Sequence, residues 1–172
     1  MHKLRLLKVL LLFLLDRQPK DLLRPVQCRF WVTPFDVELK FAVSHAYMAF
    51  AGLGRWSWNF RNIRWRGMLR ERWSPFTHSE LVYYRRAVPL FSTIEVTTTL
   101  IWWDEKMAYF EHRMTQGQGV CAIVYSRGAC YAGKERIPLR QCAFGVPQVP
   151  PMARPAIVDI WGAADSHIKQ LP

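Results

Sequence analysis

The sequence lacks the cysteine and histidine spacings that hold structural metal ions. Its four cysteines, at positions 28, 121, 130 and 142, include no Cys-x-x-Cys pair, and no His-x-x-x-His accompanies them. This argues against a structural zinc site, and the rest of the sequence does not resemble a small secreted fold held by disulfides. We therefore expect no metal, no cofactor, and reduced, mostly buried thiols in an intracellular compartment.

The N-terminal segment has no hydrophobic run long enough to cross a membrane. Its uninterrupted apolar run, Val9 to Leu15, would form a helix roughly 10 Å long, against a hydrocarbon core of roughly 30 Å. The residues that follow offer no small-residue cleavage site for a secretory signal peptide. Three interpretations of residues 1–15 remain open: a mitochondrial-type targeting or anchoring segment, an interfacial helix lying on a membrane, or a helix packed on its own domain or a partner subunit. The first rests on Lys3, Arg5 and Lys8, which precede any acid.

Acidic residues are scarce. The chain has 13 Asp+Glu against 24 Lys+Arg, a formal net charge of +11 at pH 7, which favours anionic partners. The excess is concentrated between Arg55 and Arg86, where eight arginines interleave with tryptophans. This stretch could hold the phosphates of coenzyme A, contact lipid headgroups or RNA, or dock on an acidic protein surface. Of these partners, nucleic acid is the one we do not expect.

What the sequence has in abundance is apolar residues, at 51% of its 172 positions. This composition and length suit one folded domain with tails. We expect a basic hydrophobic segment and linker over residues 1–25, because Pro19 and Pro25 interrupt any helix there. A folded domain over 26–145 follows, and then a proline-rich, extended tail over 146–172.

The folded part reads as a strand, a helix and four more strands. Residues 26–33 alternate and are rich in aromatic and β-branched side chains, whereas 34–41 read as a turn. A proline-free stretch from Ala42 to about Ile63 predicts a long, largely buried helix. Short connections then separate the predicted strands 78–86, 92–103, 108–115 and 119–127, so neighbours should be antiparallel. The pattern predicts an α+β fold, one long central helix wrapped by a curved antiparallel sheet of about five to six strands.

Two stretches give this order a family resemblance. Residues 36–47 read DVELKFAVSHAY and precede Leu53-Gly54-Arg55, and residues 103–113 read WDEKMAYFEHR. Together they resemble the signature and the hairpin of hot-dog-fold thioesterases, with one deletion needed between Ala46 and Tyr47. The resemblance covers about residues 27–127 and implies a hot-dog fold and a coenzyme A thioester as ligand.

The resemblance also implies site residues. In related enzymes the second acid of an Asp-x-Asp pair serves as nucleophile or base, and the helix beside it polarises the thioester carbonyl. The matching carboxylate is Glu38, and His45 could replace a lost donor or base. The implied substrate-binding residues are Asp36, Ser44, Tyr47 and Arg55. The signature histidine, however, is matched by Ala42, and its two asparagines are matched by Ser44 and His45.

Two functional hypotheses follow. Because the signature is degraded, the first is an accessory or scaffold subunit with lost or weak catalysis, bound to other subunits of a large, mitochondrial, membrane-associated assembly. A membrane surface or anionic lipid is a further partner in this hypothesis. The second is an active acyl-CoA thioesterase, working as a homodimer, with Glu38 as its catalytic carboxylate. Asp36, by contrast, is expected to be a turn or helix-capping acid rather than a nucleophile.

Overall fold

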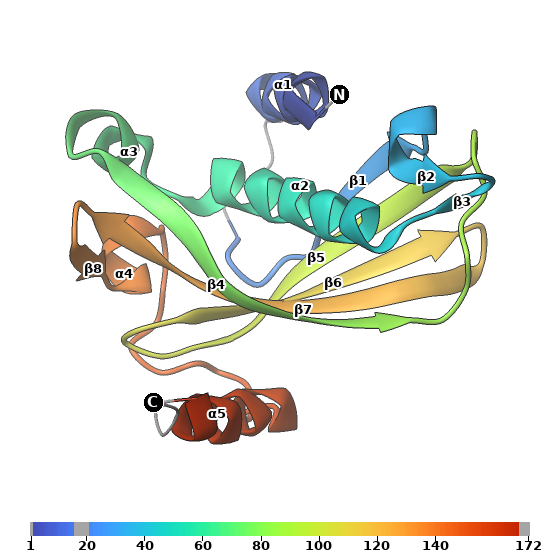
Figure 1. Ribbon diagram of the computed structural model, residues 1–172. Helices are drawn as coiled ribbons and strands as arrows, with labels where there is room; N and C mark the ends of the chain where they lie inside the picture. Colours follow the sequence, from blue (N-terminus) through green and yellow to red (C-terminus); the bar gives the residue numbers. More distant parts are fainter. Residues whose placement is uncertain (1, 16–20, 169–172) are drawn as a thin grey trace.

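A computed structural model describes residues 2–15 and 21–168 of the chain (Figure 1). Within them, a curved antiparallel sheet wraps around the long helix α2 (Ser44–Asn62). The strand order is β1-β5-β6-β7-β4, and β8 pairs with β7. The strands are β1 (Val26–Trp31), β4 (Trp73–Tyr84), β5 (Thr93–Trp103), β6 (Ala108–Gln116), β7 (Gly119–Ala132) and β8 (Glu135–Ile137). The predicted α+β hot-dog architecture is thereby confirmed.

The sheet buries one face because its strands alternate. In β5, Ile94, Val96, Thr98 and Leu100 are buried, whereas the residues between them are partly exposed. Successive side chains of a strand point to opposite faces, so these four face α2 together. Their neighbours in β1 and β6 are paired in antiparallel register, with Thr98 opposite His112. The inward faces of the strands pack against the buried face of α2.

The helix crosses the sheet very closely at Gly54. A Cβ atom built there would lie 2.4 Å from the Thr98 Oγ1 atom, closer than real side chains approach. The backbone of α2 therefore reaches β5 because residue 54 has no side chain. The neighbouring Leu53 is fully buried and anchors the same turn. This explains in structural terms why glycine stands in the Leu53-Gly54-Arg55 motif.

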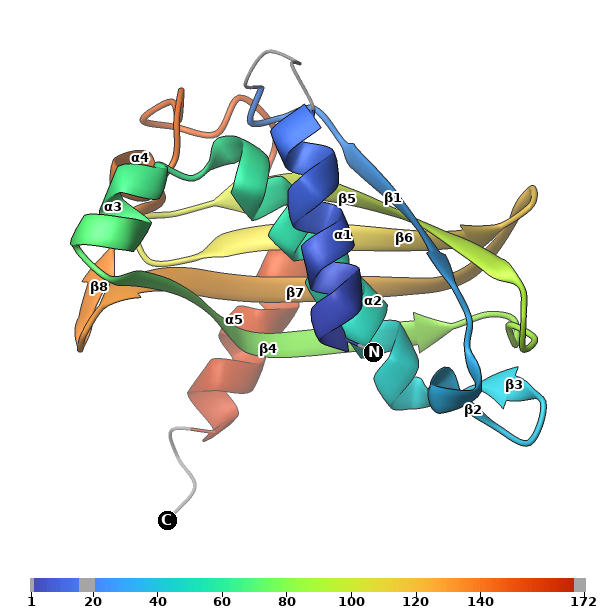
Figure 2. The ribbon, with the colours of Figure 1, turned by 90° about the horizontal axis from the view of Figure 1, so that it is seen from above.

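The N-terminal helix α1 (His2–Leu15) packs on the domain itself, which agrees with the third interpretation of this segment. Figures 1 and 2 show it lying across α2 on the side away from the sheet. Val9 is buried in the core, and Leu6 and Leu10 pack partly against it. In the described residues, no helix combines the length and apolarity needed to span a bilayer. Part of the predicted linker, residues 16–20, lies outside the described residues.

The predicted extended tail is wrong for residues 156–168. They form α5 (Ala156–Ile168), which lies against the face of the sheet opposite α2 (Figure 1). Val158 and Trp161 are buried there against Tyr109. Arg127 of β7 also donates two hydrogen bonds to the carboxylate of Asp165. The prolines before residue 156 suggested an extended chain, but apolar side chains about one helical turn apart gain burial against the sheet.

Smaller differences lie at the ends of α2. The predicted turn 34–41 contains a short 3-10 helix, η1 (Pro34–Asp36), and then a hairpin. At the other end, β4 begins before the predicted residue 78. The additional elements are β2 (Val37–Glu38), β3 (Phe41–Ala42), α3 (Trp65–Arg70) and α4 (Leu139–Cys142).

Candidate functional site

A surface groove lies at the N-terminus of α2. The residue before the helix, Val43, is extended and provides no side-chain cap. Since the first amides of a helix lack intrahelical partners, this end carries a partial positive charge. The last residues of β4 and the loop after it form the opposite wall. The lining residues are Ala42, Ser44, Tyr47, Tyr84, Arg85, Arg86 and Ala87.

Two of the predicted substrate-binding residues, Ser44 and Tyr47, line this groove. Ser44 is exposed at the start of the helix. The Tyr47 hydroxyl donates to the Arg86 carbonyl at 3.3 Å, and its ring meets that of Tyr84 edge-on with centroids 5.2 Å apart. Burial raises the pKa of Tyr47, so this hydroxyl stays protonated near neutral pH. The arginines of the opposite wall, Arg85 and Arg86, belong to the arginine-rich stretch for which coenzyme A phosphates were one expected partner.

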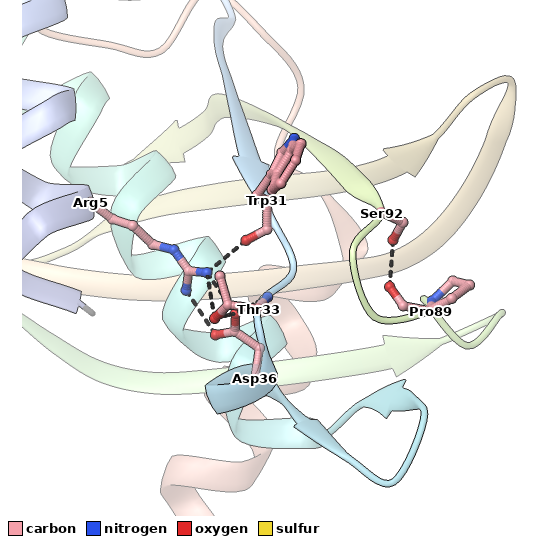
Figure 3. Close-up of polar contacts among 6 residues, drawn as sticks. All are labelled: Arg5, Trp31, Thr33, Asp36, Pro89 and Ser92. Atoms are coloured by element: carbon pink, nitrogen blue, oxygen red, sulfur yellow. Dashed lines mark hydrogen bonds and ion pairs between the residues drawn. The ribbon is translucent and has the colours of Figure 1, made fainter.

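Asp36, also predicted to bind substrate, is instead committed to contacts within the chain (Figure 3). The Arg5 guanidinium donates to Asp36 Oδ1 at 2.7 Å and to Oδ2 at 2.5 Å. Thr33 adds its backbone N–H at 2.8 Å and its hydroxyl at 2.7 Å. Burial by itself would raise the pKa of Asp36, but the hydrogen bonds from Arg5 and Thr33 and the charge of Arg5 lower it to about 2. Asp36 therefore caps η1 and anchors α1.

The two residues predicted for catalysis lie outside the groove lining. Glu38 and His45 are both exposed, and neither lines the groove. Within residues 2–15 and 21–168, neither side chain forms a hydrogen bond or an ion pair. Glu38 lies in the β2–β3 hairpin opposite Phe41, whereas His45 lies in the first turn of α2. Among the described residues, no hydrogen bond or ion pair therefore orients either group.

Arg55, the remaining predicted substrate contact, reaches into the core. It donates to Glu80 at 3.3 Å and to the Ser126 hydroxyl at 3.1 Å. Ser126 in turn lies 2.9 Å from Nε2 of His112, whose Nδ1 lies 2.9 Å from the Thr98 hydroxyl. Burial first, and then the charge of Arg55, hold the pKa of His112 well below its usual value. The alternation of strand 108–115 could have indicated that His112 points inward, but its partners could not be read from sequence.

A small pocket lies beneath the C-terminal half of α2, separate from the groove. Its lining is mainly apolar and includes Trp58, Met107, Phe110, Cys130 and Ile137, with Arg55 as a charged member. Such a lining suits an apolar group rather than a reacting centre.

The chemical character of the groove suits an anion or a polarised carbonyl. Its arginines and the positive end of α2 favour negative charge. None of its lining residues is an acid or a histidine. In the described part of the chain, no group of three or more His, Cys, Asp or Glu residues could hold a metal ion.

This architecture is similar to that of thioesterase-like proteins of known structure. A profile of the thioesterase-like superfamily matches residues 32–157. The YbaW probable thioesterase of Escherichia coli superposes with a TM-score of 0.59 at 17% identity, covering 66% of this chain and 89% of that one. The 1,4-dihydroxy-2-naphthoyl-CoA thioesterase of Synechocystis gives 0.59 at 10% identity, covering 69% and 91%.

A hypothetical protein of Staphylococcus aureus, solved in complex with CoA, gives a TM-score of 0.59 at 12% identity and covers 82% of this chain and 96% of that one. No curated protein shows significant sequence similarity to this chain. At these identities the solved structures support the fold, and the profile match over most of the chain supports the family. The chain, with its hot-dog sheet and central helix, therefore belongs to the thioesterase-like superfamily.

Proposed function

We propose that this protein binds a coenzyme A thioester at the N-terminus of α2 but hydrolyses it weakly or not at all. In this proposal it serves as an accessory or scaffold subunit of a larger assembly. The observation that carries the proposal is the lining of the groove, which is cationic and contains no acid or histidine. Asp36, which matches the first acid of the signature, is held by Arg5.

The binding half of the proposal rests on charge. Arg85 and Arg86 stand exposed on one wall of the groove, and the uncapped end of α2 forms the other. Both features favour the binding of phosphate groups. The similar Staphylococcus aureus protein was solved in complex with CoA, which makes the same ligand a reasonable probe for this chain.

The loss of catalysis rests on what surrounds the carboxylates. General acid–base help is worth roughly 100- to 10,000-fold in rate. Glu38 has a carboxylate, but no neighbouring side chain in the described residues holds it by a hydrogen bond or ion pair. Ala42, which matches the signature histidine, cannot transfer a proton. A site of this kind can hold a thioester without directing water at its carbonyl.

The alternative is an active acyl-CoA thioesterase that uses Glu38. One observation favours it: Glu38 is exposed and uncommitted in the hairpin immediately before α2. In a homodimer, a second chain could complete the surroundings that Glu38 lacks here.

The two functions separate in an acyl-CoA panel from short to long chains. We expect negligible turnover by the wild type, no change in Glu38→Gln, and no change in the matched control Glu105→Gln. Thioester binding, measured by calorimetry, should persist in Glu38→Gln and weaken in Arg85→Ser. Turnover of several per second that Glu38→Gln abolishes and Glu105→Gln spares would show that the enzyme is active.

We also propose that the assembly is mitochondrial and membrane-associated. The early basic residues Lys3, Arg5 and Lys8 and the short apolar run of α1 support this location. The test is native purification at low detergent from fractionated cells, followed by mass spectrometry. A large, stable assembly in the mitochondrial membrane fraction is expected. A free homodimer in another fraction would contradict both the location and the scaffold role.

A further inference from the structure

Helix α1 exposes a leucine face on the side turned away from α2. Leu4, Leu7, Leu11 and Leu12 are 64%, 50%, 51% and 52% exposed, although they are large and apolar. Spacings of three and four residues place Leu4, Leu7 and Leu11 along one side of a helix. Because Val9 is buried, α1 is held on the domain by one side and leaves the other without a partner within the described chain.

A second apolar group lies beside the N-terminal half of α1. Arg5 connects the two, since its guanidinium donates to Asp36 of η1 and to the Trp31 carbonyl. Phe35 and Leu39, which follow in η1 and the β2–β3 hairpin, are 74% and 98% exposed. Figure 2 looks down on this side of the molecule: α1 lies across α2, and the β2–β3 hairpin lies beyond the N-terminal ends of both helices, beside the sheet.

Leu39 is an unusual residue for its place. Its φ of 56° lies in the left-handed region that favours glycine or asparagine. A leucine there is strained, and at 98% exposure it gains almost no packing within the chain in return. An apolar side chain kept at a strained, projecting position indicates a contact outside the chain.

The charged residues around this surface are mainly basic. Lys3 and Lys8 are exposed on α1, and Lys40 is exposed beside Leu39. Glu38 is the exposed acid of the hairpin, while Asp36 is neutralised by Arg5. Apolar side chains bordered by lysines complement a surface that is negatively charged outside and apolar beneath.

We propose that this surface binds an anionic phospholipid bilayer, with α1 lying parallel to the membrane plane. The contact surface consists of Leu4, Leu7, Leu11 and Leu12 with Phe35 and Leu39. The leucines and Phe35 enter the boundary between headgroups and acyl chains, and Lys3 and Lys40 contact the phosphates, whereas Lys8 donates to the Arg29 carbonyl at 3.2 Å. This inference rests on the membrane association proposed above and names the surface that makes it.

The test is co-sedimentation of the full chain with vesicles of phosphatidylcholine, with and without phosphatidylserine. The wild type should bind the anionic vesicles more tightly. The double variant Leu7→Gln/Leu11→Gln should reduce that binding about tenfold or more, because each substitution removes apolar carbon atoms that would otherwise be buried in the bilayer. Leu39→Gln should weaken binding at a position too exposed to affect folding. Ile160→Gln is the matched control, because Ile160 is 55% exposed on α5, across the sheet.

The inference is overturned if the wild type binds neither vesicle, if the leucine variants bind like wild type, or if Ile160→Gln loses as much. It is also overturned if light scattering shows a dimer that Leu7→Gln/Leu11→Gln dissociates while vesicle binding stays unchanged, since a second copy would then cover this face. Thermal melting checks that the variants fold. Calorimetry with an acyl-CoA on the same samples tests the proposed ligand separately, so failure of one idea does not disguise failure of the other.

Discussion

His112 is a completely buried titratable residue that joins three strands. Its ring lies between Thr98 of β5 and Ser126 of β7, and both ring nitrogens are within hydrogen-bond distance of a hydroxyl. A charged imidazole there would be costly to bury and would face the Arg55 guanidinium nearby. The residue therefore acts as a neutral, polar cross-link of the core rather than as a base for catalysis.

This makes stability dependent on pH in a predictable direction. The pKa of His112 is lowered in the folded state. Below about pH 6.5, His112 therefore binds a proton in the unfolded state but stays neutral in the folded state. The contribution of His112 should therefore lower the free energy of unfolding by up to about 1.4 kcal/mol for each pH unit below that value. Urea unfolding of wild type and His112→Gln at pH 7.5 and 5.5 measures this. The variant should be less stable at pH 7.5 and lose less on acidification; equal losses would contradict a neutral His112.

The Arg5–Asp36 pair predicts a second residue-scale effect. Its side chains are 11% and 9% exposed, so removal of Arg5 leaves a largely buried carboxylate without its main partner. We expect Arg5→Met to cost about 2 kcal/mol or more in the free energy of unfolding at pH 7. Because the pKa of Asp36 is depressed to about 2, its stabilisation is present above about pH 4 and is lost as the pH falls towards 2. Denaturant melts compare this variant with Lys3→Met, an exposed control on the same helix that should change little.

At the scale of elements, the closest packing is the crossing of α2 over β5. The Leu53-Gly54-Arg55 stretch, which the family resemblance singles out, lies at this crossing. Leu53 fills the core, Gly54 admits the β5 side chains, and Arg55 extends to Glu80 and Ser126. The motif therefore serves to seat the helix, and Arg55 does not line the groove to which substrate is proposed to bind.

Two glycines of α2 give a matched test of this packing. In Gly54→Ala the added methyl would meet Thr98 Oγ1 at 2.4 Å and Val96 Cγ1 at 3.0 Å, so we expect a loss of about 1–3 kcal/mol. In Gly52→Ala the nearest atom is 3.9 Å away, at the end of the Arg55 side chain, and the helix should gain about 0.5–1 kcal/mol. Equilibrium urea unfolding measures both. A neutral or stabilising Gly54→Ala would show that α2 does not contact β5 as described.

At the scale of the whole molecule, the free edge of strand β4 is a surface at which another chain could pair with the sheet. Within the described residues β4 pairs with β7 alone, so its other edge has no strand beside it. Phe76, Leu81 and Tyr83 of this strand are exposed to 62%, 42% and 61%. A long edge strand with exposed apolar side chains is prone to pair with another chain.

We therefore expect the purified protein to have a solution mass above that of a single chain. Light scattering coupled to size exclusion measures it. Leu81→Lys/Tyr83→Lys should shift the mass towards the monomer, because lysine on an edge strand opposes pairing. Ile160→Lys, on α5, should leave the mass unchanged. A monomeric wild type would show that β4 is not an assembly surface.

The order of the elements was determined by the sequence itself. The helix predicted for 42–63 is α2 (Ser44–Asn62), and the predicted strands correspond to β1, β4, β5, β6 and β7. Proline, turn residues and the density of β-branched side chains act over a few neighbours, so they can be read locally. Ser44 and Tyr47 could be predicted as groove residues for a related reason, since the family signature places them at the start of this helix.

Only the tertiary structure decided what each site residue touches. Arg5 meets Asp36 across 31 positions, and the Tyr47 hydroxyl meets the Arg86 carbonyl across 39. Neither local periodicity nor spacing encodes such pairs, because they depend on how α1 and β4 pack against α2. The docking of α5 likewise requires the Tyr109 face of the sheet to exist before Trp161 can be buried on it. The sequence alone therefore determined the order of the main helix and strands, whereas packing between distant segments decided that Asp36 anchors α1 and that the groove contains arginines but no acid or histidine.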